Sequence, residues 1–484
     1  MKRLDQLTFT RFLAAMAVVF FHSGNVWPVN TFPFNPLLTS GQTAVSYFYV
    51  LSGFVLALAY FRRAAPFDVE AYTKARFSRI YPVYALSFLL TCLYYINIMA
   101  TVKTGKVLAN LFLLQAWNPV YALSFNIAAW SLSVEAFFYI LFPLLVVLAA
   151  RVPSRALTWF AVAFWAISQI AHSILYRAYF PDQHNLLLYF PPVHLNSFLL
   201  GFAGGVWYLS QRASRPEDQR LVRSLLLCAV FAVAAMLIAR SLVPLITESF
   251  TLDVGLLSPF FLVIILCLAV DQSSLGARLN NPRLVLLGDA SYALFILHVP
   301  VRWLGERWAA SAGIPNQIFI VVYWIGVIAL SILVYRLFER PARDWLRANF
   351  SAVGVMALDA IIILAAVYLG FAFQLGIGKA LRPLADTLRF MARAALPAYL
   401  AAFILLRLYD ELSNGRRFAR LLRRSIMAVL LGSFLVAMLL ALASRAGWVE
   451  GFSGTAILIS AALTLILAVS VRWLIRALPN LHRG

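Results

Sequence analysis

The first long apolar run of the chain, residues 8–27, contains two ionisable side chains, Arg11 and His22. They are eleven positions apart, close to three helical turns, so both are expected on one face, about 16 Å apart along the axis. Ionisable groups within a bilayer usually face a protein interior or a wet cavity, which makes both candidates for function. An imidazole in such a place can act as a general base. The alternative is that Arg11 reaches the lipid headgroups and His22 caps an outer helix end.

The composition places these residues in a membrane protein. Of the 484 residues, 63% are hydrophobic and 12% are charged, against about 25% charged in soluble domains. The net charge of +21 does not indicate a nucleic-acid partner, because the basic residues form short clusters between apolar runs. We therefore predict an all-α polytopic protein in which fourteen apolar runs cross the bilayer. The runs are residues 8–27, 41–61, 80–100, 129–150, 157–177, 192–210, 223–243, 254–270, 286–305, 316–338, 352–373, 391–409, 424–444 and 454–475.

Lys and Arg gather in alternate connections, and such connections usually lie in the cytoplasm. The basic clusters are at residues 62–79, 151–155, 212–223, 336–347 and 416–424. With the predicted spans, every cluster and both termini fall on the cytoplasmic side. Residues 1–27 are expected to be retained rather than cleaved as a signal peptide, because no small-x-small cleavage site follows His22.

Glu135 and His298 are expected at a depth similar to that of His22. Counted from the outer ends of their runs at helical rise, His22 is about 8 Å deep, Glu135 about 9 Å and His298 about 11 Å. A carboxylate at this depth needs a polar partner, and an imidazole is a natural one. We therefore expect Glu135 to pair with His22. A purely structural His–Glu pair is the alternative.

Arg76 and Arg79 are three positions apart at the cytoplasmic end of the third run. At this spacing they share one helical face. A pair of guanidinium groups suits phosphates, because each fork of donors engages two oxygens. The alternative is that both residues only anchor the helix at the cytoplasmic boundary.

Ser52 and Gly53 form a small-residue pair inside the second apolar run. Small residues let another helix backbone approach closely, so the structural interpretation is helix packing at this point.

The C-terminal part of the chain repeats none of these patterns. We divide the chain into residues 1–347 and a four-helix membrane module of unassigned role at residues 348–484. Asp359 is the acid deep in an apolar run of this module, and the sequence names no partner for it. The cysteines have neither metal nor disulfide spacing, so we predict small hydrophobic roles for them and no metal site. They are Cys92, Cys228 and Cys267.

Six stretches in series resemble acyltransferase family 3, a large family of integral membrane acyltransferases. Singly each is weak, but they occur in the family's order and cover about residues 4–345. The stretches are the Arg11-to-His22 spacing, VLSGF at 50–54, RIYP at 79–82, WSLSVEAFFY at 130–139, SYALFILH at 291–298 and ERP at 339–341.

The resemblance implies a ten-helix core in the bacterial inner membrane, here followed by the four additional helices. It implies transfer of an acyl group, usually acetyl, from cytoplasmic acyl-CoA to a hydroxyl of an extracytoplasmic carbohydrate, lipid-linked glycan or related acceptor. Acyl-CoA would be a substrate, and no permanently bound cofactor is expected. Arg11, His22 and Glu135 match positions regarded as functional in the family. The chain departs from the family pattern in its thinner basic motif, with Ser78 between the arginines, and in its C-terminal helices.

A mechanism can be written on this basis. Arg11, Arg76 and Arg79 would hold the donor at the inner side, and His22, oriented by Glu135, would take the proton of the acceptor hydroxyl. A relay through an acylated histidine stays open. The candidate substrate-binding residues, including possible oxyanion donors, are Ser52, Trp130, Ser131 and His298.

The alternative function is a transporter or flippase of a glycan or lipid-linked substrate. The sequence shows no inverted repeat, and its ionisable residues are expected in one outer layer rather than at the bilayer midplane, where transport sites usually lie. The C-terminal helices are also a candidate surface for self-association or for docking a partner.

Overall fold

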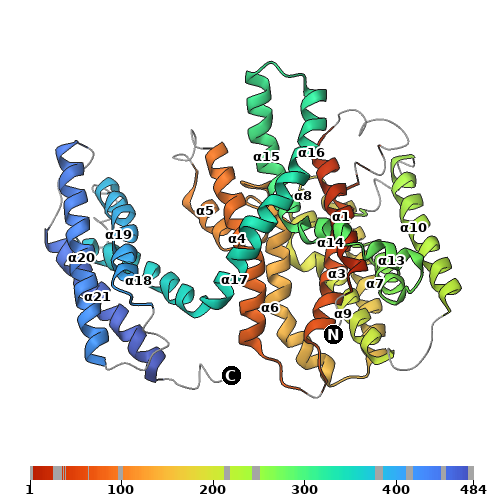
Figure 1. The fold of residues 1–484 in the computed structure, drawn as a ribbon, viewed down its shortest axis with the longest axis horizontal. Coiled ribbons are helices and arrows are strands. Elements are labelled where there is room, and N and C mark those ends of the chain that lie inside the picture. Colours follow the sequence, from red (N-terminus) through yellow and green to blue (C-terminus); the bar gives the residue numbers. More distant parts are fainter. Residues whose placement is uncertain are drawn as a thin grey trace. The chain divides into compact units, whose positions relative to one another are not determined.

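The computed structural model describes residues 4–24, 35, 38, 40–63, 65–95, 102–211, 218–242, 251–375, 385–409, 418–447 and 454–477. Within these residues every regular element is a helix, which confirms the predicted all-α class (Figure 1). The chain divides into two compact units, residues 1–344 and 345–484. This division lies three residues before the boundary drawn from the sequence.

The first unit is a bundle of long helices joined by short ones. Its elements are α1 Gln6–His22, α3 Thr43–Tyr60, α4 Val69–Tyr94, α5 Thr104–Leu111, η2 Gln115–Trp117, η3 Ile127–Ala129, α6 Trp130–Ala150, α7 Ser154–Tyr179, α8 His184–Tyr189, η4 Pro191–His194, α9 Leu195–Gln211, α10 Gln219–Leu242, α12 Ser258–Val270, α13 Ser274–Leu279, α14 Pro282–Asp289, α15 Ser291–Ser311, α16 Asn316–Val334, the π-helical turn η5 Tyr335–Glu339 and α17 Arg340–Ala348, which crosses the division.

Each of the fourteen predicted runs contains a helix, but the number of spans is smaller by length and composition. Within the described residues, eight helices are long and apolar enough to cross a membrane, or nine if α14 and α15, bent by 51°, form one span. The helices α1 and α12 have only 17 and 13 residues, fewer than the roughly 20 that a straight span needs. The chain is a multi-pass helical membrane protein, and the full count of fourteen is not established.

Helices α3 and α9 touch through their backbones. A methyl group added at Gly53 would lie 2.2 Å from the backbone oxygen of Phe198, and one at Gly201 would lie 1.9 Å from that of Val50. Only glycine fits at such an approach, so the predicted packing through small residues is confirmed. The stacked rings of Phe138 and Phe198, 4.5 Å apart, join α6 to the same pair of helices.

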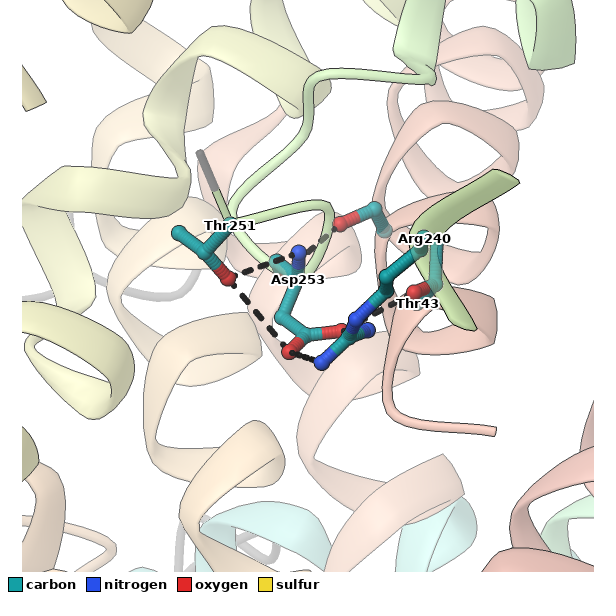
Figure 2. Close-up of polar contacts among 5 residues, drawn as sticks. Thr43, Arg240, Thr251 and Asp253 are labelled. Atoms are coloured by element: carbon teal, nitrogen blue, oxygen red, sulfur yellow. Dashed lines mark hydrogen bonds and ion pairs between the residues drawn. The ribbon is translucent and has the colours of Figure 1, made fainter. Parts of the chain in front are cut away.

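A buried carboxylate fixes the start of α3. Asp253 accepts a hydrogen bond from Thr43 Oγ1 at 2.9 Å and forms an ion pair with Arg240 at 3.2 Å. Figure 2 shows Asp253 with Thr43 and Arg240 on one side and Thr251 on the other. The carboxylate of Asp253 is also favoured at this place because it lies at the N-terminus of α3. Through Thr43 and Arg240 it links α3 and α10 to the loop before α12. It thereby sets the position of the helix that carries Ser52.

The second unit contains α18 Phe350–Leu375, α19 Ala385–Leu405, α20 Phe418–Arg445 and α21 Gly454–Ala477. Its core includes a charged pair that the sequence did not reveal. Asp359 on α18 binds Arg472 on α21 through two hydrogen bonds of 2.9 and 2.7 Å, and both side chains are 0% exposed. Each member therefore supplies the partner that the other needs in an apolar core.

Candidate active site

A cavity of about 530 Å³ lies in the first unit among α1, α3, α4, α6, α15 and η5. Six of the nine residues predicted for the site line it. They are Arg11, Ser52, Arg76, Arg79, Ser131 and Glu135. Arg343, Asp289 and Glu339 are the other charged residues of its lining. The structure thus collects the predicted donor-binding residues around one space.

Two arginines of this cavity, Arg11 and Arg79, are not neutralised by contact, whereas Arg343 pairs with Asp344 at 3.4 Å. Arg11 and Arg79 form no ion pair and no hydrogen bond with another described residue, and both line the cavity. The carboxylates of Glu135, Glu339 and Asp289 act on Arg11 electrostatically without touching it. A half-buried charge held in this way can interact strongly with an anion entering the cavity.

Arg76 is held by aromatic side chains instead of a carboxylate. Its Nη2 donates a hydrogen bond of 3.2 Å to Tyr60 Oη, and its guanidinium lies 5.4 Å from the ring centre of Tyr60 and 5.9 Å from that of Tyr139. Cation–π contacts of this kind orient a guanidinium without cancelling its charge. The donors of Arg76 remain suited to phosphate oxygens.

Glu135 belongs to this large cavity. Its Oε1 accepts hydrogen bonds from Tyr139 Oη, one turn later on α6, and from Ser52 Oγ at 3.4 Å. The predicted contact between Glu135 and His22 is not among the contacts of the described residues. That pairing was wrong.

His22 pairs with His298. His22 Nδ1 lies 3.0 Å from His298 Nε2 and 3.1 Å from the backbone oxygen of Val18. His298 Nδ1 lies 2.6 Å from the backbone oxygen of Phe295. Because a carbonyl can only accept, both Nδ1 atoms carry the proton, and His298 Nε2 accepts from His22. Among the described residues no hydrogen bond of the His22 Nε2 atom is found, and its lone pair points away from these two hydrogen bonds.

The backbone around His298 is itself fixed. Tyr323 Oη on α16 donates a hydrogen bond of 2.9 Å to the carbonyl oxygen of His298, and the side chain of His298 is fully buried. The helices α15 and α16 lie side by side (Figure 1). His298 is thus a rigid support for His22.

A second, smaller cavity of about 200 Å³ contains His22. Trp130, the remaining predicted site residue, lines it together with Tyr189 and Gln42. The rings of Trp130 and Tyr189 are 4.9 Å apart. The site therefore consists of two neighbouring spaces, one lined by arginines and one containing the histidine.

The error in the depth estimate has a physical cause. Depth was counted from the ends of apolar runs, which assumed that the first helix continues to Trp27. Instead α1 ends at His22, where the backbone N–H of Ser23 bonds back to the last turn. His22 is therefore at the end of its helix, whereas Glu135 is the sixth residue of α6.

Sequence reasoning missed several side chains of the site. Tyr139 is four residues after Glu135, so the i,i+4 rule could have found it. Glu339 was noted only as part of a motif; it is 4% exposed, and its Oε2 has no hydrogen-bond partner among the described residues. Tyr60 and Tyr323 gave no signal, because their roles arise from contacts between distant segments.

Comparison with known proteins identifies the family. The acyltransferase family 3 model, described as an acyltransferase domain, matches residues 4–336. The chain belongs to acyltransferase family 3. The suspected resemblance is thereby confirmed, and the enzyme is an O-acyltransferase.

Two relatives show how far the similarity of this acyltransferase extends. Acyltransferase MdmB of Streptomyces mycarofaciens is 30% identical over 326 residues, covering 63% of this chain and 80% of the relative. O-acetyltransferase OatA of Staphylococcus aureus is 23% identical over 372 residues, covering 71% of this chain and 59% of the relative. The chain thus spans less than two thirds of OatA. No solved structure matches the chain.

Proposed function

We propose that this acyltransferase moves an acyl group, in the first instance acetyl, from acyl-CoA to a hydroxyl of an extracytoplasmic carbohydrate or related acceptor. The observation that carries the proposal is the pairing of two spaces. Within the described residues, three arginines without contacting carboxylates line the large cavity, and a histidine supported through Nδ1, with its Nε2 unbonded there, lies in the adjoining small one.

The large cavity is the proposed donor site. Arg11, Arg76 and Arg79 suit the phosphate groups of coenzyme A, since guanidinium groups bind phosphate oxygens in pairs. The basic clusters favour a cytoplasmic position for this side of the protein and for both termini. In a bacterium the membrane would be the inner membrane, where acyl-CoA is available from within.

The acyl transfer takes place between the two cavities. His22 Nε2 accepts the proton of the acceptor hydroxyl as the oxygen forms its bond to the thioester carbonyl carbon. The carbon–sulfur bond breaks, and the coenzyme A thiolate takes the proton back from His22. Ser52 and Ser131 line the donor cavity and are the proposed hydrogen-bond donors to the oxyanion. In this structure their hydroxyls donate to Glu135 Oε1 and to the backbone oxygen of Ala128, so each must turn from that acceptor when the oxyanion forms.

Two supporting roles follow from the contacts. His298 replaces Glu135 as the residue that orients His22, because its Nε2 accepts the His22 Nδ1 proton. Glu135, bonded to Tyr139 and Ser52, instead sets the geometry of the donor cavity.

Sided vesicles test the proposal. Labelled acetyl-CoA is added to inside-out vesicles that contain a soluble glycan extract and to right-side-out vesicles suspended in the same extract, so that the acceptor is on the extracytoplasmic side in both. Label should appear on the acceptor only when acetyl-CoA reaches the cytoplasmic face, and vesicles without the protein are the control. Equal labelling from either face, or none, would refute the proposed direction of transfer. Comparing acyl groups on surface glycans and small secreted molecules between a deletion strain and its parent identifies the acceptor.

A further inference from the structure

The two cavities of the site adjoin at two side chains. Val45 on α3 and Phe295 on α15 line both the large cavity with the arginines and the small cavity with His22. We infer that these two residues form a partition that selects the acyl group, admitting acetyl to His22 and holding back longer chains. This inference rests on the proposed function.

The partition is packed firmly. Val45 is 4% exposed and Phe295 is 7% exposed. The ring of Phe48, one turn after Val45 on α3, meets the ring of Phe295 edge-on at 5.6 Å. Edge-to-face packing restrains an aromatic ring, so the ring of Phe295 keeps its place between the cavities.

Phe295 also belongs to the same helical turn as the histidine support. Its carbonyl oxygen accepts the hydrogen bond from His298 Nδ1, while its ring forms the partition. The contact with His298 uses the backbone, so shortening the Phe295 side chain changes the partition and leaves this hydrogen bond available. Ring and histidine can therefore be tested separately.

The reaction requires the acyl carbon to meet a hydroxyl that contacts His22, while the rest of coenzyme A stays on the side of the arginines. An acetyl group has one methyl group beyond its carbonyl carbon. Each additional methylene must find space at the partition, and packed protein interiors resist such insertion. One methylene more or less in an apolar site typically changes specificity by about 10- to 200-fold. The size of the Val45 and Phe295 side chains thus sets the acyl length.

The experiment compares acyl-CoA donors in proteoliposomes containing the full chain. For each variant, kcat/KM is measured with acetyl-, butyryl- and hexanoyl-CoA and the same acceptor. Wild type should favour acetyl-CoA, and Phe295→Ala should shift the hexanoyl-to-acetyl ratio at least about tenfold toward hexanoyl. Val45→Ala should shift it in the same direction by less, because fewer atoms are removed.

Two matched variants enlarge one cavity each without touching the partition. Leu132 lines only the large cavity and Ile127 only the small one. Leu132→Ala and Ile127→Ala should keep the wild-type ratio within about threefold, whatever their total rate, because the partition is intact. If Phe295→Ala does not fold, Phe295→Leu provides the same test with a smaller change.

The outcomes separate this inference from the proposed function. A wild-type protein that uses no acyl-CoA refutes the proposed function itself. A wild-type protein that uses hexanoyl-CoA as well as acetyl-CoA overturns the partition. So does a shift in Leu132→Ala equal to that in Phe295→Ala.

Discussion

The two units of the chain hold the arginines of their helices in opposite ways. In residues 345–484, Arg472 binds Asp359 through two hydrogen bonds, and neither side chain reaches solvent. The rings of Phe403 and Tyr409 lie 5.5 and 5.6 Å from its guanidinium. In residues 1–344, Arg11 and Arg79 line a cavity and form no ion pair within the described part of the chain.

The difference shows what distinguishes a structural charge from a functional one. A charge removed from water is costly unless a partner compensates it. The second unit supplies that partner from its own chain, so nothing further needs to bind. In the first unit no described carboxylate contacts Arg11 or Arg79, and the cavity beside them has room for an anion. The sequence alone therefore does not show whether an arginine in an apolar run is structural or functional; its partner decides. The variants below test this distinction, from the largest to the smallest expected effect on acyl transfer.

The largest effect should come from His22→Ala. Without the general base, the acyl-transfer rate at saturating acetyl-CoA should fall by about a thousandfold. Single-turnover transfer from labelled acetyl-CoA measures it, with the amount of protein in the membrane as the control. Wild-type transfer by a well-accumulated variant would exclude His22 from the chemistry.

His298 should have the next largest effect. Replacing it by Leu removes the acceptor for the His22 Nδ1 proton and should lower kcat by about a hundredfold, since the imidazole loses its orientation. His298→Gln keeps an acceptor oxygen near this place and should recover part of the rate. Equal loss in both variants would mean that His298 matters only for packing. Glu135→Gln, measured alongside, should change KM for the donor more than kcat.

Arg79→Gln tests the role of an arginine that lines the large cavity and has no contacting carboxylate among the described residues. Losing one charge-assisted contact to phosphate should raise KM for acetyl-CoA by about 10- to 100-fold, with a smaller change in kcat. Arg155 is exposed in the first turn of α7 and is the matched control. If Arg155→Gln raised KM as much, the effect would reflect general charge and not the cavity.

The sequence predicted the helices well, because apolar runs report directly on membrane burial. Arg11 and Glu135 were singled out because expensive charges in apolar runs stand out, and Arg76 and Arg79 because they share one helical face at the end of a basic cluster. Their meeting in one cavity was not foreseen, since Glu135 was expected beside His22. The pairing of these residues was not predictable, because it depends on where each helix ends and how it is rotated. Depth arithmetic placed His298 in the layer of His22 without predicting their contact, and it led to the wrong pairing of His22 with Glu135.

The same limit applies to Asp359, whose partner Arg472 lies 113 residues later in the chain. Asp359 had no visible partner in the sequence, because the sequence does not show which helices of the module are neighbours. The contact of Gly53 with α9 was foreseeable for the opposite reason. A glycine next to Ser52 in an apolar run has few uses other than close packing.

The smallest effect on acyl transfer is expected in the second unit. Asp359→Leu leaves Arg472 buried without a partner and should destabilise this unit by about 3–5 kcal/mol. Acyl transfer per folded molecule should remain within about twofold of wild type, because no residue of this ion pair lines either cavity. Thermal unfolding in detergent and limited proteolysis of residues 345–484 measure the stability.

The double variant Asp359→Leu with Arg472→Met decides whether this pair is purely structural. Replacing a buried ion pair by apolar side chains of similar size is often neutral, so the double variant should regain most of the stability lost in Asp359→Leu. If stability returns and acyl transfer is unchanged, the charges of the second unit serve only its own packing. If stability returns but transfer is lost, Asp359 and Arg472 take part in the reaction. The contrast between an arginine paired with a carboxylate and the unpaired arginines of the cavity would then fail.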